Sequence, residues 1–309
     1  MLVKAYGCAV FGIEATIVTV EVNISNGVNF FLVGLPDSAV KESQQRIQAA
    51  LKNNGYKIPV KEITVNMAPA DIRKEGSAYD MTIAIGILAA SEQINPETIS
   101  DYLIMGELSL DGSLQPLKGV LPIAIEARKH GLKGIILPKQ NAKEAAIVDG
   151  LDVYGVENIK DVIDFFNEEK ELEKTIVNTR EEFYNQLLSS DLDFKDVKGQ
   201  QNIKRAFEIA AAGGHNIILI GPPGAGKSML AKRLPTILPP FSLQEALETT
   251  KIHSVTGSLD SNEALMSSRP FRKPHHTIYG SLPICNISLK AIKPSLLPLP
   301  DPNDQSLGA

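Results

Sequence analysis

The sequence is poor in the residues that mark secreted, metal-binding and membrane proteins. It has no tryptophan and only two cysteines, Cys8 and Cys285, whose spacing matches neither a metal motif nor a redox motif. No apolar run approaches the roughly 18 residues of a membrane-spanning helix. The N-terminal residues lack the charged start and long apolar core of a signal peptide. These absences predict a reduced, cytoplasmic protein with no membrane partner.

Charge is present but unevenly distributed. The chain of 309 residues carries a net charge of −5, to which residues 1–195 contribute −9 and residues 196–309 contribute +4. A mildly basic second part fits nucleotide or nucleic acid, although a charge of +4 also fits an ordinary protein surface. The length predicts about two domains.

The most informative stretch lies at residues 216–229. An apolar run at 217–220 leads into a glycine-rich turn that ends in Lys227 and Ser228, with the spacing G-x-x-x-x-G-K-[ST] of a P-loop. The glycines let backbone N–H groups point at phosphate oxygens. The helix expected to begin near Lys227 adds its positive end. Lys227 can reach the β- and γ-phosphates, and the Ser228 hydroxyl can ligate Mg²⁺. The motif predicts a nucleoside triphosphate and Mg²⁺ as cofactors.

The first part, residues 1–168, alternates between predicted strands and helices. Strands are expected at 14–22, 29–33, 62–67, 102–110, 134–138 and 151–154. Helices are expected at 37–54, 77–90, 120–130, 141–148 and 158–167. Asn26-Gly27 is a hairpin signal between the first two strands. The helix at 77–90 is nearly all apolar and should be buried. This order predicts an α/β or α+β domain with its own core.

Several motifs of the first part occur in a specific order. They are Gly34-Leu35-Pro36-Asp37, Lys41-Glu42-Ser43 with Arg46-Ile47, the run Arg73-Lys74-Glu75-Gly76-Ser77-Ala78-Tyr79-Asp80, and Gly106-Glu107-Leu108-Ser109-Leu110-Asp111-Gly112. With these motifs, residues 1–168 resemble the N-terminal domain of the YifB/ComM-type magnesium-chelatase-like proteins. That domain is similar to the Lon protease catalytic domain, of ribosomal-protein-S5-domain-2-like fold.

This resemblance raises the possibility of a Ser–Lys peptidase, in which a lysine deprotonates the serine. Ser77 is the only candidate nucleophile in its segment. The helix in which the lysine is expected carries Leu121 near that position, and Lys118 just before it is the only nearby substitute. Without a base the serine is inert, so we predict no peptidase activity and interpret Ser77 as a helix N-cap.

Residues 169–190 are interpreted as a linker, and the domain boundary is placed near residue 190. The charge-dense stretch 168–174 fits either an exposed helix or a flexible connector. Residues 191–278 resemble the N-terminal part of the ATPase domain of AAA+ proteins, specifically of the magnesium-chelatase-like branch. The fold class implied is therefore α/β, with a Lon-like α+β domain followed by an incomplete P-loop AAA+ core.

The resemblance also completes the predicted site. In this group the Val-x-Gly-Gln segment lies beside the adenine, which implies that Val197, Gly199 and Gln200 contact the base. The residues predicted to hold ATP are these three together with Gly221, Pro222, Pro223, Gly224, Ala225, Gly226, Lys227, Ser228 and Met229. Ser228 is also the predicted Mg²⁺ ligand. No catalytic residue is assigned.

Two features of the family are missing or ambiguous. A hydrolysing P-loop enzyme needs an apolar strand that ends in acidic residues, and no Asp-Glu pair follows Ser228. The pair His275-His276 lacks further ligands at useful spacing, so a zinc site is not predicted. Pro270 and Pro274 predict an extended loop around it, facing a central pore or nucleic acid. The tail 279–309 is rich in Pro, Leu and Ser and is predicted to be disordered. We interpret it as out-of-frame or unrelated sequence ending a truncated family member.

The resemblance implies several functions that the sequence leaves open. Intact relatives resemble hexameric ATP-driven motors acting on DNA, linked to branch migration in natural transformation. A magnesium-chelatase-type motor subunit is the alternative, although the Lon-like domain favours the first. A nucleotide-binding fragment that hydrolyses nothing is the third, and the missing carboxylates favour it. A half-built ATPase core should leave apolar sheet faces uncovered, which predicts poor solubility of residues 191–309 expressed alone.

Overall fold

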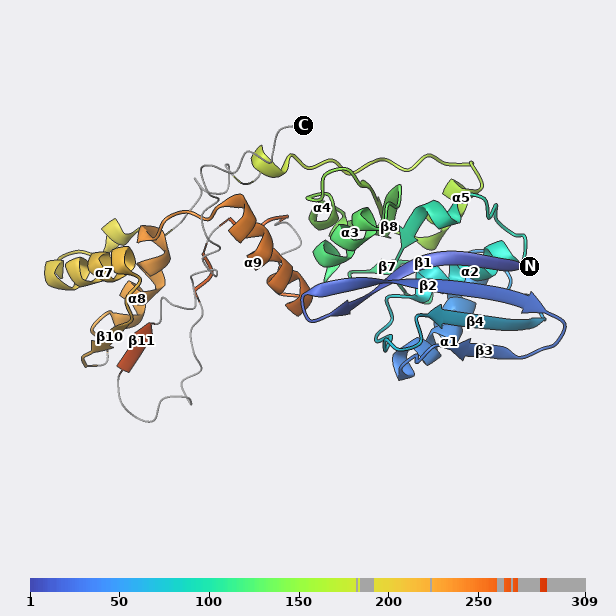
Figure 1. Ribbon diagram of the computed structural model, residues 1–309, viewed down its shortest axis with the longest axis horizontal. Helices are drawn as coiled ribbons and strands as arrows, with labels where there is room; N and C mark the ends of the chain where they lie inside the picture. The colour runs from blue at the N-terminus through green and yellow to red at the C-terminus, as the bar shows by residue number, and fades with distance from the viewer. Residues whose placement is uncertain are drawn as a thin grey trace, which may run out of the picture. The chain divides into compact units, whose positions relative to one another are not determined.

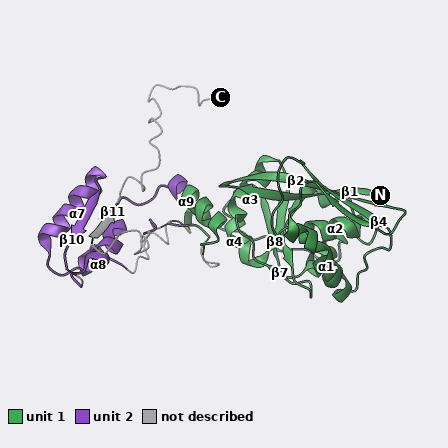
Figure 2. Ribbon diagram, turned by 90° about the horizontal axis from the view of Figure 1, so that it is seen from below, with its two compact units in different colours: residues 1–182, 247–265 green, residues 183–246, 266–309 purple. Residues whose placement is uncertain are grey.

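The computed structural model describes residues 1–181, 183, 192–222, 224–259, 264–267 and 269–271, together with the backbone of Ile284–Ile287. The chain divides into two compact units, drawn in separate colours in Figure 2. Unit 1 comprises residues 1–182 and 247–265, and unit 2 comprises residues 183–246 and 266–309. Residues 247–265, placed by the sequence in the ATPase part, therefore belong to the first unit.

Unit 1 is built on a mixed seven-stranded sheet in the order β3-β4-β2-β1-β5-β8-β9 (Figure 1). Its strands are β1 (Leu2–Phe11), β2 (Glu14–Ser25), β3 (Phe30–Val33), β4 (Glu62–Ala68), β5 (Tyr102–Ile104), β8 (Gly134–Pro138) and β9 (Asp152–Val156). The pairs β1–β2 and β2–β4 are antiparallel, and the other neighbours are parallel. A separate ribbon is formed by β6 (Glu107–Leu108) and β7 (Leu114–Gln115).

The hairpin of this sheet joins β1 to β2. Phe11 pairs with Glu14, which leaves a two-residue turn that begins at Gly12, with a φ of 60°. The predicted hairpin at Asn26-Gly27 is wrong, because β4 lies between β2 and β3 and pairs with both. The turn at Asn26-Gly27 thus connects β2 to β3 across the start of β4, and β2 and β3 do not pair with each other.

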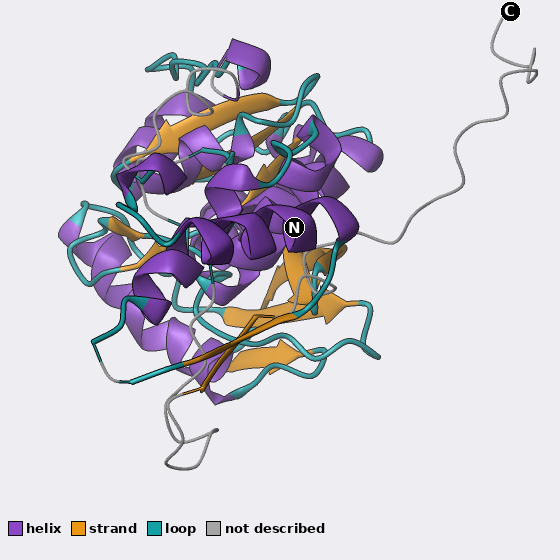
Figure 3. Ribbon diagram, turned by 90° about the vertical axis from the view of Figure 1, so that its left-hand side faces the viewer, coloured by secondary structure: helices purple, strands orange, loops and turns teal. Residues whose placement is uncertain are grey.

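The five helices predicted in residues 1–168 are present. They are α1 (Ser38–Asn53), α2 (Asp80–Ala90), α3 (Val120–Lys129), α4 (Ala142–Ala145) and α5 (Ile159–Phe166). Asp37 caps α1 by accepting a 2.8 Å bond from the Val40 amide. Every residue of α2 is buried, as its apolar sequence predicts, and α2 packs against β1 and β2. Figure 3 shows the helices in purple and the strands in orange for the described residues.

The predicted linker is neither a helix nor a free connector in its first half. Lys174 forms a bridge with Tyr154 of β9, and the amide of Thr175 donates to the carbonyl oxygen of Val153 at 2.8 Å. The ammonium of Lys174 also pairs with Asp152 at 2.8 Å. The end of the charge-dense segment, at Lys174 and Thr175, therefore pairs with the free edge of β9.

Unit 2 contains the helices α7 (Gln201–Gly213) and α8 (Lys227–Arg233), the strand β10 (Ile217–Ile220) and the first turn of α9 (Leu243–Thr256). Its core is a cluster of buried residues from α7, α8 and the segments just before α7 and just after α8: Phe194, Val197, Phe207, Ala210, Leu230, Ala231 and Leu234. The strand β11 (Ile284–Ile287) pairs antiparallel with β10. These four residues belong to the tail predicted to be disordered, and the rest of that tail lies outside the described residues.

The strand β10 has one covered face and one open face. Ile217 and Leu219 pack against the buried cluster, whereas Ile218 and Ile220 are 59% and 79% exposed. In α/β folds with parallel sheets both faces of such a strand are normally covered. Exposed β-branched residues on a short sheet are a site of self-association.

We therefore expect Ile220→Ser to reduce self-association of the full chain without lowering its unfolding temperature. Sedimentation velocity at increasing protein concentration measures the association. Ile217→Ser is the matched control, and it should destabilise unit 2 because Ile217 packs against the cluster. If Ile220→Ser and the unmodified chain self-associate to the same extent, the open face of β10 does not drive self-association.

Candidate nucleotide-binding site

The predicted P-loop joins β10 to α8, as its sequence requires. Gly224 and Gly226 have φ values of 81° and 80°, a left-handed conformation that glycine adopts without strain. A Cβ atom at either position would meet nothing within 4 Å, so the space beside the loop is open. The amide of Leu230 donates to the Gly226 carbonyl oxygen at 3.0 Å and starts the helix. The loop thus offers a bent backbone beside free space.

Lys227 lies over this loop. Its ammonium nitrogen donates to the carbonyl oxygens of Gly221 and Pro222 at 2.7 and 2.8 Å. Both acceptors are neutral backbone groups of the loop. A phosphate group would offer the ammonium a stronger, charge-assisted bond.

The residues fit a nucleotide phosphate better than they fit a metal ion alone. Ser228 and Met229 are exposed, so the Ser228 hydroxyl is accessible to a ligand. Mg²⁺ binds through one or two protein oxygens together with substrate phosphates. Among the described residues, no group of three or more His, Cys, Asp or Glu could hold a metal ion. Ser228 would therefore hold Mg²⁺ only together with a bound triphosphate.

The segment predicted to contact the base is fixed to α8. Val197 is buried in the same cluster as Leu230 of α8. Arg233, also on α8, donates to the Asp193 carbonyl oxygen at 3.1 Å and pairs with Asp196 at 3.4 Å. Sequence reasoning missed the role of Arg233, although a basic residue in the last turn of a helix was a signal for it.

The three residues of this segment predicted to contact the base differ in exposure. The side chain of Val197 is only 4% exposed, so it packs in the core of unit 2. Gly199 and Gln200 are exposed and both have positive φ values, 70° and 52°. Their backbone and the Gln200 side chain are the accessible part of the Val-x-Gly-Gln segment. Pro223 and the pair His275-His276 lie outside the described residues.

The motifs that carry the Lon-like resemblance converge in unit 1. Pro36 forms a parallel bridge with Lys74, and the amide of Gly76 donates to the Asp37 carboxylate at 3.1 Å. The amide of Gly106 donates to the Ala78 carbonyl oxygen at 2.9 Å. Three segments distant in sequence therefore form one hydrogen-bonded cluster beside the start of α2.

An ion pair lies at the centre of this cluster. Arg46 donates to both carboxylate oxygens of Asp80, at 2.7 and 3.0 Å, and to the Ala39 carbonyl oxygen at 3.0 Å. The Leu108 amide donates to the same carboxylate at 3.3 Å. Burial raises the pKa of Asp80 above its ordinary value, while the Arg46 guanidinium opposes that rise. The pair joins α1, α2 and β6.

The Ser77 position differs from the sequence prediction. Helix α2 begins at Asp80 with Tyr79 as its N-cap, so the interpretation of Ser77 as the cap is wrong. The Ser77 hydroxyl donates instead to the Glu107 carboxylate. Leu121 is buried, and no hydrogen bond or ion pair among the described residues joins Lys118 to Ser77.

We expect the chain to cleave no protein substrate, with or without ATP, because Ser77 has a carboxylate partner in place of a lysine. Incubation with fluorescent casein, read as release of peptides, measures this. Ser77→Ala should give the same background as the unmodified chain. Cleavage that disappears in Ser77→Ala would contradict the expectation.

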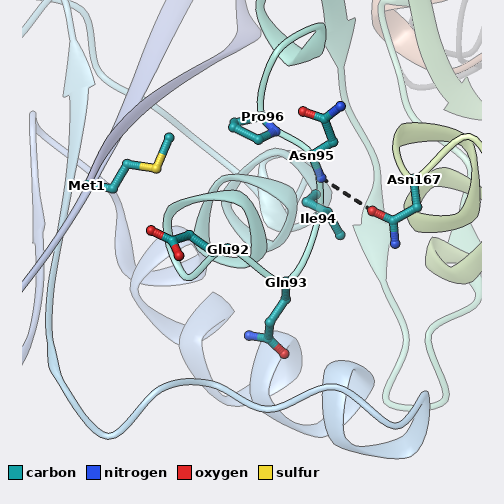
Figure 4. A pocket seen from close by; sticks show the side chains of 7 residues that line it. All are labelled: Met1, Glu92, Gln93, Ile94, Asn95, Pro96 and Asn167. Atoms are coloured by element: carbon teal, nitrogen blue, oxygen red, sulfur yellow. Dashed lines mark hydrogen bonds between the residues drawn. The ribbon is translucent and has the colours of Figure 1, made fainter.

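A shallow depression in unit 1 lies away from these residues. It has a volume of about 490 Å³ and is lined by Met1, Glu92, Gln93, Ile94, Asn95, Pro96 and Asn167 (Figure 4). The amide of Asn95 donates to the Asn167 side-chain oxygen at 3.3 Å. Glu92 is its one ionisable side chain, and none of the predicted site residues lines it. The depression is therefore not part of the candidate site.

Comparison with known proteins identifies both units. Residues 20–141 match the family model described as subunit ChlI of Mg-chelatase, and residues 193–282 match the model described as magnesium chelatase, subunit ChlI. The chain is 43% identical over 277 residues to competence protein ComM of Haemophilus influenzae, covering 89% of this chain and 54% of that protein. It is 43% identical over 270 residues to protein YifB of Escherichia coli, covering 87% and 52%.

A more distant match covers less of the chain. Lon protease 2 of Bacillus subtilis is 29% identical over 129 residues, which is 41% of this chain and 23% of that protein. The chain belongs to the YifB/ComM-type magnesium-chelatase-like family, with an α/β fold and Lon-like homology. It spans about half the length of the curated relatives that it matches. Within the described residues, no helix has both the length and the apolar character needed to cross a bilayer.

Proposed function

We propose that this chain binds ATP with Mg²⁺ at residues 221–229. The observation that supports this most directly is the position of Lys227. Its ammonium is held by two loop carbonyl oxygens beside open space, within reach of phosphates bound on the loop. When bound, Mg²⁺ would supply charge neutralisation at the phosphates, with the Ser228 hydroxyl as the ligand from this chain.

We further propose that the chain holds ATP without hydrolysing it. The attacking water of a P-loop enzyme is oriented by a carboxylate at the end of a second strand. The sequence after Ser228 contains six acidic residues, and none follows an apolar strand: Glu245, Glu248, Asp260, Glu263, Asp301 and Asp304. Two of these residues, Glu245 and Glu248, lie on the helix α9 and not at the end of a strand.

The test is a pair of measurements on the full chain. Binding of a fluorescent ATP analogue with Mg²⁺ is followed by anisotropy, and phosphate release is followed with and without branched DNA. Saturable binding without phosphate release supports both proposals. DNA-stimulated release would overturn the second proposal and leave the first, and absence of binding would overturn the first.

We propose that proteins of this family act in ATP-driven DNA processing in the cytoplasm, as homohexamers. The name of the Haemophilus relative, competence protein ComM, is the observation that favours DNA as a partner over a porphyrin. The family models named for magnesium chelatase favour the alternative of a chelatase-type motor subunit. The similarity to Lon protease 2 favours DNA processing over the chelatase-type role. Binding of branched DNA by the full chain would favour the role in DNA processing, and binding of a porphyrin would favour the chelatase-type role.

A further inference from the structure

Helix α9 is shared by the two units. Its first residues, up to Ala246, belong to unit 2, and residues from 247 onwards belong to unit 1. Only residues 234–242 separate α9 from the end of α8, the helix that follows the P-loop. A change at the nucleotide site therefore has a short covalent route to α9.

The first turn of α9 is fixed within unit 2. Ser242 and Glu245 form a reciprocal cap, in which the Ser242 amide donates to the Glu245 carboxylate at 2.8 Å and the Glu245 amide donates to the Ser242 hydroxyl at 3.2 Å. Arg269 pairs with the Glu245 carboxylate at 3.6 Å and lies 4.4 Å from the ring centre of Phe241. It also donates to the Pro239 carbonyl oxygen at 2.9 Å. The start of α9 is therefore held by several contacts.

The rest of α9 is bound by the N-terminal domain. Thr250 and Ser254, one turn apart, are 0% and 3% exposed. The amide of Gly119, the residue before α3, donates to the Ser254 carbonyl oxygen at 3.0 Å. Gly257 lies against Lys118 so closely that a Cβ atom at 257 would come within 2.7 Å of the lysine Cε. These contacts dock the end of α9 on the start of α3.

The start of α3 is itself held by a buried carboxylate. Glu144 accepts a 2.8 Å bond from the Leu121 amide, in the first turn of α3. The chain segment that leads from unit 1 into unit 2 at residue 183 is held just after α4. There, the Thr179 hydroxyl donates to the Ile147 carbonyl oxygen at 3.2 Å. Both segments that lead to unit 2 are therefore held by the α3–α4 region of unit 1.

We propose that α9 couples the P-loop unit to the N-terminal domain. The N-terminal domain binds residues 247–257 through the start of α3, so that nucleotide binding changes the stability of that contact. This rests on the proposed ATP binding. The docking of residues 247–257 does not depend on the proposed ATP binding, because every contact that forms it lies within unit 1.

Amide hydrogen exchange of the full chain tests the docking first. Ser254→Arg introduces a charge at a buried position, and the amides of Gly119 and Leu121 should then exchange at least about tenfold faster. Ile252→Arg places the same residue on the same helix at a position that is 44% exposed, and it should leave exchange unchanged. Strands β1, β2 and β4 report whether the domain is still folded. Equal protection at Gly119 in both variants would overturn the docking.

The second arm tests the coupling. Saturation with Mg²⁺ and ATP should change exchange at the start of α3 at least about threefold in the unmodified chain and in Ile252→Arg, and not in Ser254→Arg. Anisotropy of a fluorescent ATP analogue on the same samples reports binding. Binding without any change at the start of α3 overturns the coupling alone. No binding overturns the proposed function and, with it, the coupling, while the first arm still decides the docking.

Discussion

Replacing Lys227 by alanine should weaken ATP binding by about 2 to 4 kcal/mol, which is roughly 30- to 700-fold in affinity. The ammonium of Lys227 lies 2.7 and 2.8 Å from the carbonyl oxygens of Gly221 and Pro222 in the loop. A phosphate bound on the loop would gain a charge-assisted bond from it. Anisotropy titration of a fluorescent ATP analogue in the presence of Mg²⁺ measures the change.

Lys232→Ala is the matched control for this variant. Lys232 lies on the same helix, α8, with an exposed side chain, so its removal subtracts the same charge without touching the loop. Its affinity should stay within about twofold of the unmodified chain. An equal loss in both variants would indicate general electrostatic attraction. An unchanged affinity in Lys227→Ala would contradict binding at this loop.

Replacing Arg46 by methionine should destabilise unit 1 by about 3 to 5 kcal/mol, because it leaves the Asp80 carboxylate buried without its cation. The side chain of Asp80 is 1% exposed, and the two bonds from Arg46 hold both of its oxygens. Urea unfolding followed by circular dichroism measures the change. Arg73→Met is the control, because the Arg73–Glu75 pair is 68% exposed on both sides and exposed pairs contribute little.

The same variant should alter the dependence of stability on pH. Burial raises the pKa of Asp80 in the folded chain, and Arg46 lowers it. A group with a raised folded pKa contributes stability below its unfolded pKa, and this contribution is lost as pH rises through the folded pKa. Without Arg46 the rise in the pKa of Asp80 is larger, so Arg46→Met should lose more stability than the unmodified chain as pH rises above the unfolded pKa of this carboxyl group. Parallel pH profiles would contradict a charge-based role for the pair.

The elements predicted correctly from the sequence are those whose signals lie within a few neighbouring residues. The cap at Asp37 and the positive φ of Gly55 set the two ends of α1, and both were readable from the sequence. The all-apolar composition of α2 predicted its burial. The P-loop was predicted because a strand, a glycine-rich turn and a lysine occur at fixed spacing.

The errors concern contacts between segments distant in sequence. Strand β1 was missed because Ala5, Gly7 and Ala9 give it weak strand propensity, although they let it pack closely against α2. The Asn26-Gly27 turn has a hairpin sequence, and only the pairing of β4 with both neighbours excludes the hairpin. The hydrogen bond of Ser77 to Glu107 spans 30 residues, so no local rule could replace the N-cap interpretation.

The site was predictable in its chemistry and less so in its packing. The spacing of Lys227 and Ser228 indicates which groups can meet phosphate, but it says nothing of what holds the neighbouring segment. That role falls to Arg233, which bonds to Asp193 and Asp196. The assignment of residues 247–265 to unit 1 was also beyond sequence reasoning, because it depends on contacts of α9 with Gly119 and Lys118.

The central claim is that the chain holds ATP at residues 221–229 and leaves it intact. The most direct measurement is to incubate the purified full chain with radiolabelled ATP and Mg²⁺, isolate the protein-bound nucleotide and separate ATP from ADP. We predict that the bound nucleotide is ATP, in amounts that fall to background in Lys227→Ala. Recovery of bound ADP that accumulates with time, or of no nucleotide from the unmodified chain, would contradict the account.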